Sequence, residues 1–200
     1  FVFIIFIFFF SKSFYAQCAN PGASTSICQG TTSAAMGGSL FSPATGGTWS
    51  GGAGTWTDPT DVTNARYTAG ASESGSITLT LTTSGGICGS VKYTKSITVN
   101  ATPSVPTVAS TTQPTCGTPS GTIVFATQAG VEYSVGGVTF QPTQTISGLA
   151  PNTYTLTVRS TTDNTCTTNA ASSVTINAVP SAPSVPTVAS TTQPTCGTPS

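Results

Sequence analysis

The sequence PSVPTVASTTQPTCGTPS at residues 103–120 returns without a change at residues 183–200. The two copies begin 80 residues apart. A repeat of this length and identity indicates a tandem array, in which residues 103–182 form one unit and a second unit begins at residue 183. We therefore expect a modular chain, and we expect the printed sequence to be a piece of a longer protein.

The residues between the two copies predict short β-strands. Apolar and β-branched residues alternate with Thr and Ser, and Gly, Pro and Asn separate the runs. No run has the apolar spacing of three and four residues that an amphipathic helix needs. About six strands with turns between them indicate an antiparallel β-sandwich. The predicted strands are residues 122–125, 131–135, 138–140, 144–146, 154–159 and 173–176, with Gly136 and Gly137 forming a hairpin turn.

Residues 17–102 differ from the repeat but follow the same pattern. SITLTLTT at residues 76–83 alternates apolar residues with Thr, and VKYTKSITV at residues 91–99 alternates similarly, with Lys95 as the exception. Trp49 and Trp56 each follow Gly-Thr, which suits two successive strands around a Gly-rich turn. We expect this part of the chain to form a first sandwich of its own.

The first sixteen residues predict a signal peptide whose true start lies upstream. FVFIIFIFFF is wholly apolar, and Ala16 provides a small residue for cleavage. Ten apolar residues are too few to cross a hydrocarbon core, which needs roughly 20. We expect residues 1–16 to be removed and the mature chain to be secreted, without membrane insertion. Lipid attachment at Cys18 is an alternative, although the residues before it do not form a lipidation signal.

The low charge of the chain argues against some partners. Its 200 residues include five basic and five acidic side chains and no His. Such a chain has no surface that attracts phosphate backbones or anionic lipids strongly, so we expect no nucleic acid or membrane partner. The lack of His, together with the lack of a CxxC pair, argues against a zinc site.

Six cysteines in a secreted chain predict disulfide bonds. In the repeat, one cysteine lies near the start and another near the end, and Cys196 occupies the position of Cys116 in the next copy. We expect pairing within modules and leave the partner of Cys18 open. The predicted pairs are Cys28–Cys88 and Cys116–Cys166.

The acidic residues offer few candidate sites. Asp58 and Asp61 lie in the sequence DPTD, where we expect a turn rather than a catalytic carboxylate pair, with or without Glu73. Calcium binding at Asp58 and Asp61, with Asn64, stays open because carboxylate and amide oxygens are ligands for this ion. No Ser lies in a Gly-x-Ser-x-Gly motif, so we expect no enzyme activity and no cofactor.

Trp49 and Trp56 have two interpretations. Aromatic side chains fill the cores of β-sandwiches, and they also form platforms for sugar rings when they are exposed on a β-surface. We expect core or edge packing and keep carbohydrate contact as the alternative for both residues.

ISGLAPNTYTLTVR at residues 146–159 resembles the corner between strands E and F of fibronectin type III and related Ig-like domains. The resemblance implies that Tyr154 is structural and donates a hydrogen bond to backbone between Leu149 and Asn152. GTWSGG and SGSITLTLT, at residues 47–52 and 74–82, resemble a PKD-like Ig domain. The whole unit resembles modules of secreted surface proteins and adhesins of the Bacteroidetes. These resemblances imply tandem antiparallel Ig-like and fibronectin-III-like β-sandwiches.

The expected function follows from this organisation. We expect a signal peptide at residues 1–16, a PKD-like module at 17–102, a disulfide-closed fibronectin-III-like repeat at 103–182 and the start of the next repeat at 183–200. Such modules serve as non-catalytic adhesin or stalk repeats on the cell surface, with a polysaccharide or another surface protein as ligand. The alternative is accessory, carbohydrate-binding modules of a secreted polysaccharide-degrading enzyme.

Overall fold

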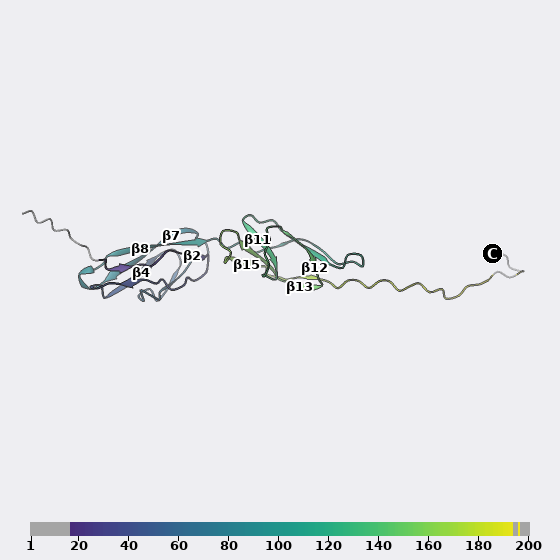
Figure 1. Ribbon diagram of the computed structural model, residues 1–200, viewed down its shortest axis with the longest axis horizontal. Coiled ribbons are helices and arrows are strands. Elements are labelled where there is room, and N and C mark those ends of the chain that lie inside the picture. Colours follow the sequence, from purple (N-terminus) through teal and green to yellow (C-terminus); the bar gives the residue numbers. More distant parts are fainter. Residues whose placement is uncertain (1–16, 194–195, 197–200) are drawn as a thin grey trace, which may run out of the picture. The chain divides into compact units, whose positions relative to one another are not determined.

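A computed structural model describes residues 17–193 and 196, so the predicted signal peptide lies outside the described residues. Apart from one short 3-10 helix, the regular secondary structure of these residues is β-strand (Figure 1). They fold as two compact units. The first unit contains the described residues up to Ser104 and the segment Arg159–Thr168, and the second contains Val105–Val158 and the described residues from Asn169 onward. The segment Arg159–Thr168 therefore belongs to the first unit, although its sequence is part of the repeat.

The first unit is built on a four-stranded sheet with strand order β2-β8-β7-β4. Figure 1 labels these four strands. Two smaller sheets, β1-β3 and β5-β6, accompany it. The strands are β1 (Ala19–Asn20), β2 (Thr25–Cys28), β3 (Ser39–Leu40), β4 (Gly46–Gly51), β5 (Thr55–Thr57), β6 (Arg66–Thr68), β7 (Gly75–Ser84) and β8 (Lys92–Asn100). A short 3-10 helix, η1 (Gly86–Cys88), joins β7 to β8.

The two long strands of this unit confirm the alternation in the sequence. β7 and β8 pair antiparallel, with Ile77 opposite Ile97 and Leu81 opposite Tyr93. β4 pairs with β7 rather than with β5, so Trp49 and Trp56 lie in different sheets. β2 pairs with β8 in parallel, which differs from the antiparallel prediction. Parallel pairing brings the ends of both strands to one edge, and Cys28 lies opposite Asn100 there.

The core of the first unit contains one charged residue. Lys95 is only 4% exposed, although the alternation in β8 marked it as the exception on an apolar face. Its Nζ donates a hydrogen bond of 2.8 Å to the carbonyl oxygen of Met36. Burial lowers the pKa of Lys95 from its ordinary value, because an uncompensated charge is costly away from water. The other buried side chains here include Met36, Trp49, Tyr67, Leu79, Leu81, Ile97 and Val99.

The second unit has two three-stranded sheets, β12-β10-β9 and β11-β14-β15, and the pair β13-β16. Its strands are β9 (Val108–Thr112), β10 (Gly121–Phe125), β11 (Val131–Val135), β12 (Thr145–Leu149), β13 (Asn152–Tyr154), β14 (Leu156–Ser160), β15 (Thr167–Asn169) and β16 (Val174–Ile176). β14 and β15 cross the division between the units. The core of the second unit contains Ile123, Phe125, Tyr133, Leu149, Leu156, Val158 and Ile176.

The predicted strand at residues 138–140 is wrong. Gly136 and Gly137 both have positive φ angles, 81° and 71°, and the chain turns there. The backbones of Tyr133 and Gln141 then form an isolated bridge, and Val138 is 89% exposed. The apolar run therefore lies in a turn and not in a strand, with the side chain of Val138 in solvent.

β9 lies in the first copy of the repeated sequence and was not among the predicted strands. Thr111 pairs with Ile123 and Thr112 with Thr122, so β9 forms an edge of its sheet beside β10.

Within the described part of the chain, no helix is long and apolar enough to cross a membrane.

Candidate functional site

Two disulfide bonds join cysteines that lie far apart in the sequence. Cys18 bonds to Cys88 across 70 residues, and Cys28 bonds to Cys166 across 138 residues. The predicted pairs Cys28–Cys88 and Cys116–Cys166 are therefore wrong. Cys166 lies in the segment Arg159–Thr168, which belongs to the first unit and brings its sulfur to Cys28 at the end of β2. Cys116 and Cys196 are exposed free thiols.

The bond at Cys18 also bears on the lipid alternative. Its sulfur is occupied by Cys88, and its backbone N–H donates to the hydroxyl of Tyr93 at 2.8 Å. In this structure Cys18 is a structural residue of the first sandwich.

The bond between Cys28 and Cys166 lies within a network of polar contacts. Oδ1 of Asp163 accepts hydrogen bonds from the backbone N–H and the hydroxyl of Thr165, at 3.0 and 2.6 Å. Its Oδ2 accepts one from Nδ2 of Asn100 at 2.8 Å. These bonds, those from Thr165 first, hold the pKa of Asp163 below its ordinary value. An ionised Asp163 therefore ties the loop that carries Cys166 to the last residue of β8.

These residues also form the only group of three potential metal ligands in the described residues, Cys28, Asp163 and Cys166. Both sulfurs of the group are used in the disulfide bond. Metal binding needs thiolates, so the oxidised site is a cross-link and offers one carboxylate alone.

The two cross-links restrict the unfolded chain strongly. The chain-entropy model gives about 4.4 kcal/mol for closing a loop of 70 residues and about 5.0 kcal/mol for 138 residues. The two loops overlap, because Cys88 lies between Cys28 and Cys166, so the values do not add. Either bond alone represents a large part of the stability of a typical domain.

Trp49 is a core residue. It is 2% exposed, and its Nε1 donates to the carbonyl oxygen of Val62 at 3.0 Å. Trp56 stacks on it with ring centroids 5.8 Å apart and is half-buried. A sugar outside the molecule cannot reach the face of Trp49, so carbohydrate contact at Trp49 is excluded in this fold. For Trp56 it stays a prediction.

Glu73 stabilises the loop after β4, a role that the sequence analysis did not predict. Its Oε2 accepts a hydrogen bond of 2.6 Å from the hydroxyl of Tyr67, and its Oε1 accepts one of 2.8 Å from the N–H of Ala53. The Tyr67 hydroxyl in turn accepts a hydrogen bond of 2.7 Å from the backbone N–H of Gly54. Tyr67 is fully buried and Glu73 half-buried, so the pair supports the loop after β4 and does not face a substrate.

The two groups of this pair have shifted pKa values. Burial, followed by the hydrogen bond to Glu73, raises the pKa of Tyr67 to about 12. Burial also raises the pKa of Glu73, but the hydrogen bonds that it accepts, from Tyr67 first, outweigh burial and leave its pKa below the ordinary value. Glu73 is therefore ionised at neutral pH and Tyr67 is protonated, so neither is poised as a general acid or base near pH 7.

The DPTD sequence forms the expected turn. The N–H of Asp61 donates to the carbonyl oxygen of Asp58 at 2.9 Å. Oδ1 of Asp61 accepts from the N–H groups of Asn64 and Thr63 at 2.9 and 3.2 Å, and its pKa is lowered by these bonds, those from Asn64 first. The Asp61 carboxylate is thus used to cap a turn. Calcium at Asp58 and Asp61 stays a prediction.

Tyr154 makes a local structural contact. Its hydroxyl donates a hydrogen bond of 2.9 Å to the carbonyl oxygen of Ala150, within the stretch that the resemblance indicated. The contact holds the turn between β12 and β13.

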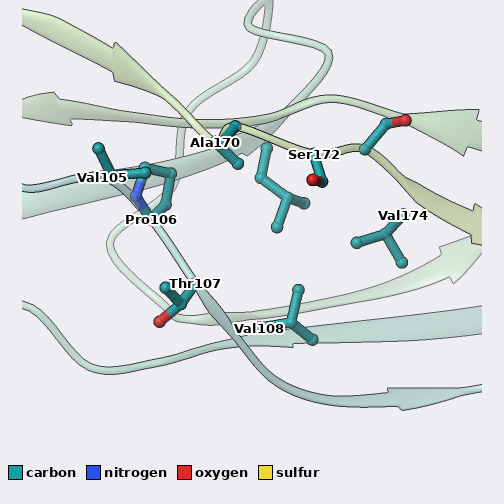
Figure 2. Close-up of a pocket in the computed structure, with 10 residues that line it drawn as sticks. Val105, Pro106, Thr107, Val108, Ala170, Ser172 and Val174 are labelled. Carbon is teal, nitrogen blue, oxygen red and sulfur yellow. The ribbon is translucent and has the colours of Figure 1, made fainter.

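The second unit has an apolar groove of about 280 Å³, shown in Figure 2. Val105, Pro106 and Val108 line one side of it, Ala170 to Val174 line the other, and the buried side chain of Leu156 is among its lining residues. Its lining residues include no titratable group, and its volume is below that of ordinary ligand pockets, roughly 300–1,000 Å³. The groove therefore offers no chemistry of its own.

Protein-family models and curated proteins give no match to this sequence. Solved structures with a similar fold include the fibronectin(III)-like modules of CbhA from Clostridium thermocellum, with 12% identity, a TM-score of 0.38, and coverage of 80% of this chain and 94% of that one. The titin domains z1z2 in complex with telethonin have 15% identity, a TM-score of 0.32 and coverage of 82% and 98%.

A third solved structure is SGBP-B of the mixed-linkage glucan utilization locus of Bacteroides ovatus, in complex with a mixed-linkage heptasaccharide. It has 16% identity, a TM-score of 0.23, and coverage of 78% of this chain and 43% of that one. These likenesses concern the fold alone. The sheets and cores described above give the fold class of the chain, which is all-β, with mainly antiparallel sheets and a separate core in each of the two units.

Proposed function

We propose that the chain consists of non-catalytic modules of an exported protein, which act as stalk or adhesin repeats outside the cell. The observation that carries this proposal is the disulfide bond from Cys28 to Cys166. Disulfide bonds persist in oxidising compartments and are rare in the cytosol. The repeated sequence at residues 103–120 and 183–200 supports an array in which such modules follow one another.

The position of this bond suits a chain that is held under tension. Force applied to the two ends of the chain passes from Cys28 to Cys166 through the sulfur atoms. The strands from β3 to β14 lie inside the closed loop and cannot be drawn out while the bond is intact. A stalk built in this way protects the strands inside the loop when a ligand at one end is pulled, while β15 and β16 lie outside the loop.

The low charge of the chain fits the same role. The 200 residues include five basic and five acidic side chains, so the surface is poor in charge. Such a surface has little attraction for charged macromolecules, which is suitable for a spacer between a cell and its target.

Labelling of intact producing cells with a membrane-impermeant maleimide, followed by capture with antibodies to this chain, tests the proposal. In cells that produce the chain as printed, without a following repeat, we expect label on the exposed thiol of Cys116 without cell lysis, and label on Cys28 and Cys166 only after reduction. Protease added to intact cells should also remove the antibody signal. A chain that is labelled only after lysis, with Cys28 and Cys166 as free thiols, would show that the protein works in a reducing compartment.

A further inference from the structure

We propose that Cys116 forms a disulfide bond with the following repeat. The cysteine of that repeat that corresponds to Cys166 would bond to Cys116 in the same way as Cys166 bonds to Cys28. The partner is thus a second copy of this module. The inference deepens the proposed stalk function and rests on it for an oxidising compartment. It rests on three observations within this chain.

The first observation is that Cys166 reaches backward along the chain. Its sequence belongs to the repeat at residues 103–182, yet it bonds to a cysteine of the module that precedes the repeat. The segment Arg159–Thr168 around it belongs to the first unit as well. A repeat of this sequence therefore carries a loop that attaches to the module before it.

The second observation is the place of the receiving cysteine. Cys28 lies opposite Asn100 in the pairing of β2 with β8, and the N–H of the next residue, Gln29, donates to the carbonyl oxygen of Asn100 at 2.9 Å. Asn100 is the third residue before the start of the first copy at Pro103. Cys28 therefore lies where the chain leaves its module to begin a repeat.

The third observation is that Cys116 lies at the same place in the next module. Its thiol donates a hydrogen bond of 3.2 Å to the carbonyl oxygen of Pro180. Pro180 is the third residue before the start of the second copy at Pro183. Cys116 is an exposed free thiol, so it is accessible to a loop of the repeat that begins there.

The cysteine content of the repeat agrees with this assignment. The repeat at residues 103–182 has two cysteines. Cys166 bonds to the module before the repeat, and Cys116 is left to bond to the repeat after it. Cys196 is the receiving cysteine of the second copy. Since Cys166 is used by Cys28, a pair within the repeat is not available to Cys116.

Formation of the new bond requires an external disulfide as oxidant, such as an oxidised thiol–disulfide oxidoreductase. The Cys116 thiolate attacks one sulfur of this donor and forms a mixed disulfide. The thiolate of the incoming repeat then attacks the Cys116 sulfur. Two thiols lose two electrons and two protons in total, and the donor leaves as a dithiol.

The test extends the full chain by the missing part of the second repeat, with residues 121–182 appended after Ser200. The protein is oxidised with glutathione disulfide, its free thiols are alkylated and its peptides are mapped by mass spectrometry. We expect three links, namely Cys18–Cys88, Cys28–Cys166 and a link from Cys116 to the last cysteine of the appended repeat. Cys196 should be alkylated in full.

Matched variants identify the receiving cysteine. Cys116→Ser should leave the last cysteine of the appended repeat alkylated, whereas Cys196→Ser should leave all three links unchanged. A link from Cys196 to that last cysteine, a link from Cys116 to Cys196, or an alkylated Cys116 would each overturn the inference. So would loss of Cys28–Cys166 in the extended chain, because that bond is the template. The mapping is done on purified protein, so its outcome is separate from that of the cell-labelling test.

Discussion

The two copies of PSVPTVASTTQPTCGTPS have the same sequence and different structures. In the first copy, Val108–Thr112 form β9 beside β10. In the described part of the second copy, residues 183–193 and 196, no strand forms. Val108 is 38% exposed and its counterpart Val188 is 77% exposed, and Val105 and Val185 differ in the same direction, at 54% and 83%.

The difference shows that this sequence becomes a strand only when a partner is present. β10 follows the first copy directly and pairs with it, whereas the described part of the second copy pairs with no strand. Intrinsic β-propensity is the same in both copies, so it cannot explain the difference. What decides is pairing with β10, as expected if β-propensity depends mainly on the structural context of a segment.

The largest expected effect is on the extension of the chain under force, because the two copies lie on different sides of the Cys28–Cys166 disulfide bond. The first copy lies inside the loop closed by Cys28 and Cys166, and the second lies outside it. Stretching the full chain by handles at its two ends should therefore draw out the second copy and leave the first folded. Reduction should add roughly 470 Å of extension, because 138 residues are released at about 3.4 Å each.

Force-extension curves with and without dithiothreitol measure this difference. The double variant Cys28→Ser, Cys166→Ser should show a smaller gain without reductant, because Cys18–Cys88 still closes its own loop. Equal contour lengths in both conditions would mean that the first copy bears load just as the second does.

A second prediction concerns the stability of the first unit at alkaline pH. This unit contains Tyr67, whereas neither copy of the repeated sequence contains a Tyr. The pKa of Tyr67 is about 12 in the folded chain, above the ordinary value of 10.0. The folded state thus keeps a proton that the unfolded state loses. The stability that this provides is complete below pH 10 and is lost as the pH rises through 12. Two pKa units correspond to about 2.7 kcal/mol.

Urea unfolding of the first unit, followed by Trp fluorescence at pH 8 to 12, measures this loss. Tyr67→Phe should flatten the pH dependence, while Tyr154→Phe serves as a control in the second unit. Lys95 acts in the opposite direction, because its lowered pKa adds stability as the pH rises toward 10.5. A Tyr67→Phe chain that keeps the full alkaline loss would assign the effect to another group.

The sequence predicted those features whose signal is local. The period-two alternation of β7 and β8 lies within single runs of residues, and it gave both strands to within a residue or two. The contact of Tyr154 with Ala150 spans four residues, so a short motif could contain it. The fold class followed from many such local signals with the same meaning.

The features that the sequence missed depend on partners far away in the chain. Disulfide connectivity cannot be deduced from sequence, since six cysteines allow 15 arrangements. Cys166 met Cys28 because its loop belongs to the other unit, which no spacing indicates. The burial of Lys95 depends on a carbonyl 59 residues away at Met36. β9 is missed for the same reason, as its existence depends on β10.

The smallest expected effect is also the most direct comparison of the two copies. Thr111 is half-buried and pairs with Ile123 in β9, whereas its counterpart Thr191 is exposed and lies in no strand. Thr111→Gly should therefore destabilise the second unit by about 1 kcal/mol, since the span of β-propensities is about that size. Thr191→Gly, the same substitution in the same local sequence, should leave its unfolding unchanged.

Amide hydrogen exchange of β10 measures this pair of variants, because its exchange rates report the opening of the second unit. The expected change for Thr111→Gly is about a fivefold increase in exchange, and for Thr191→Gly none. Equal effects of the two substitutions would mean that the second copy also pairs with β10, in exchange with the first. In that case the identical sequences would compete for one sheet edge, and the contrast between a strand with a partner and the same segment without one would not hold.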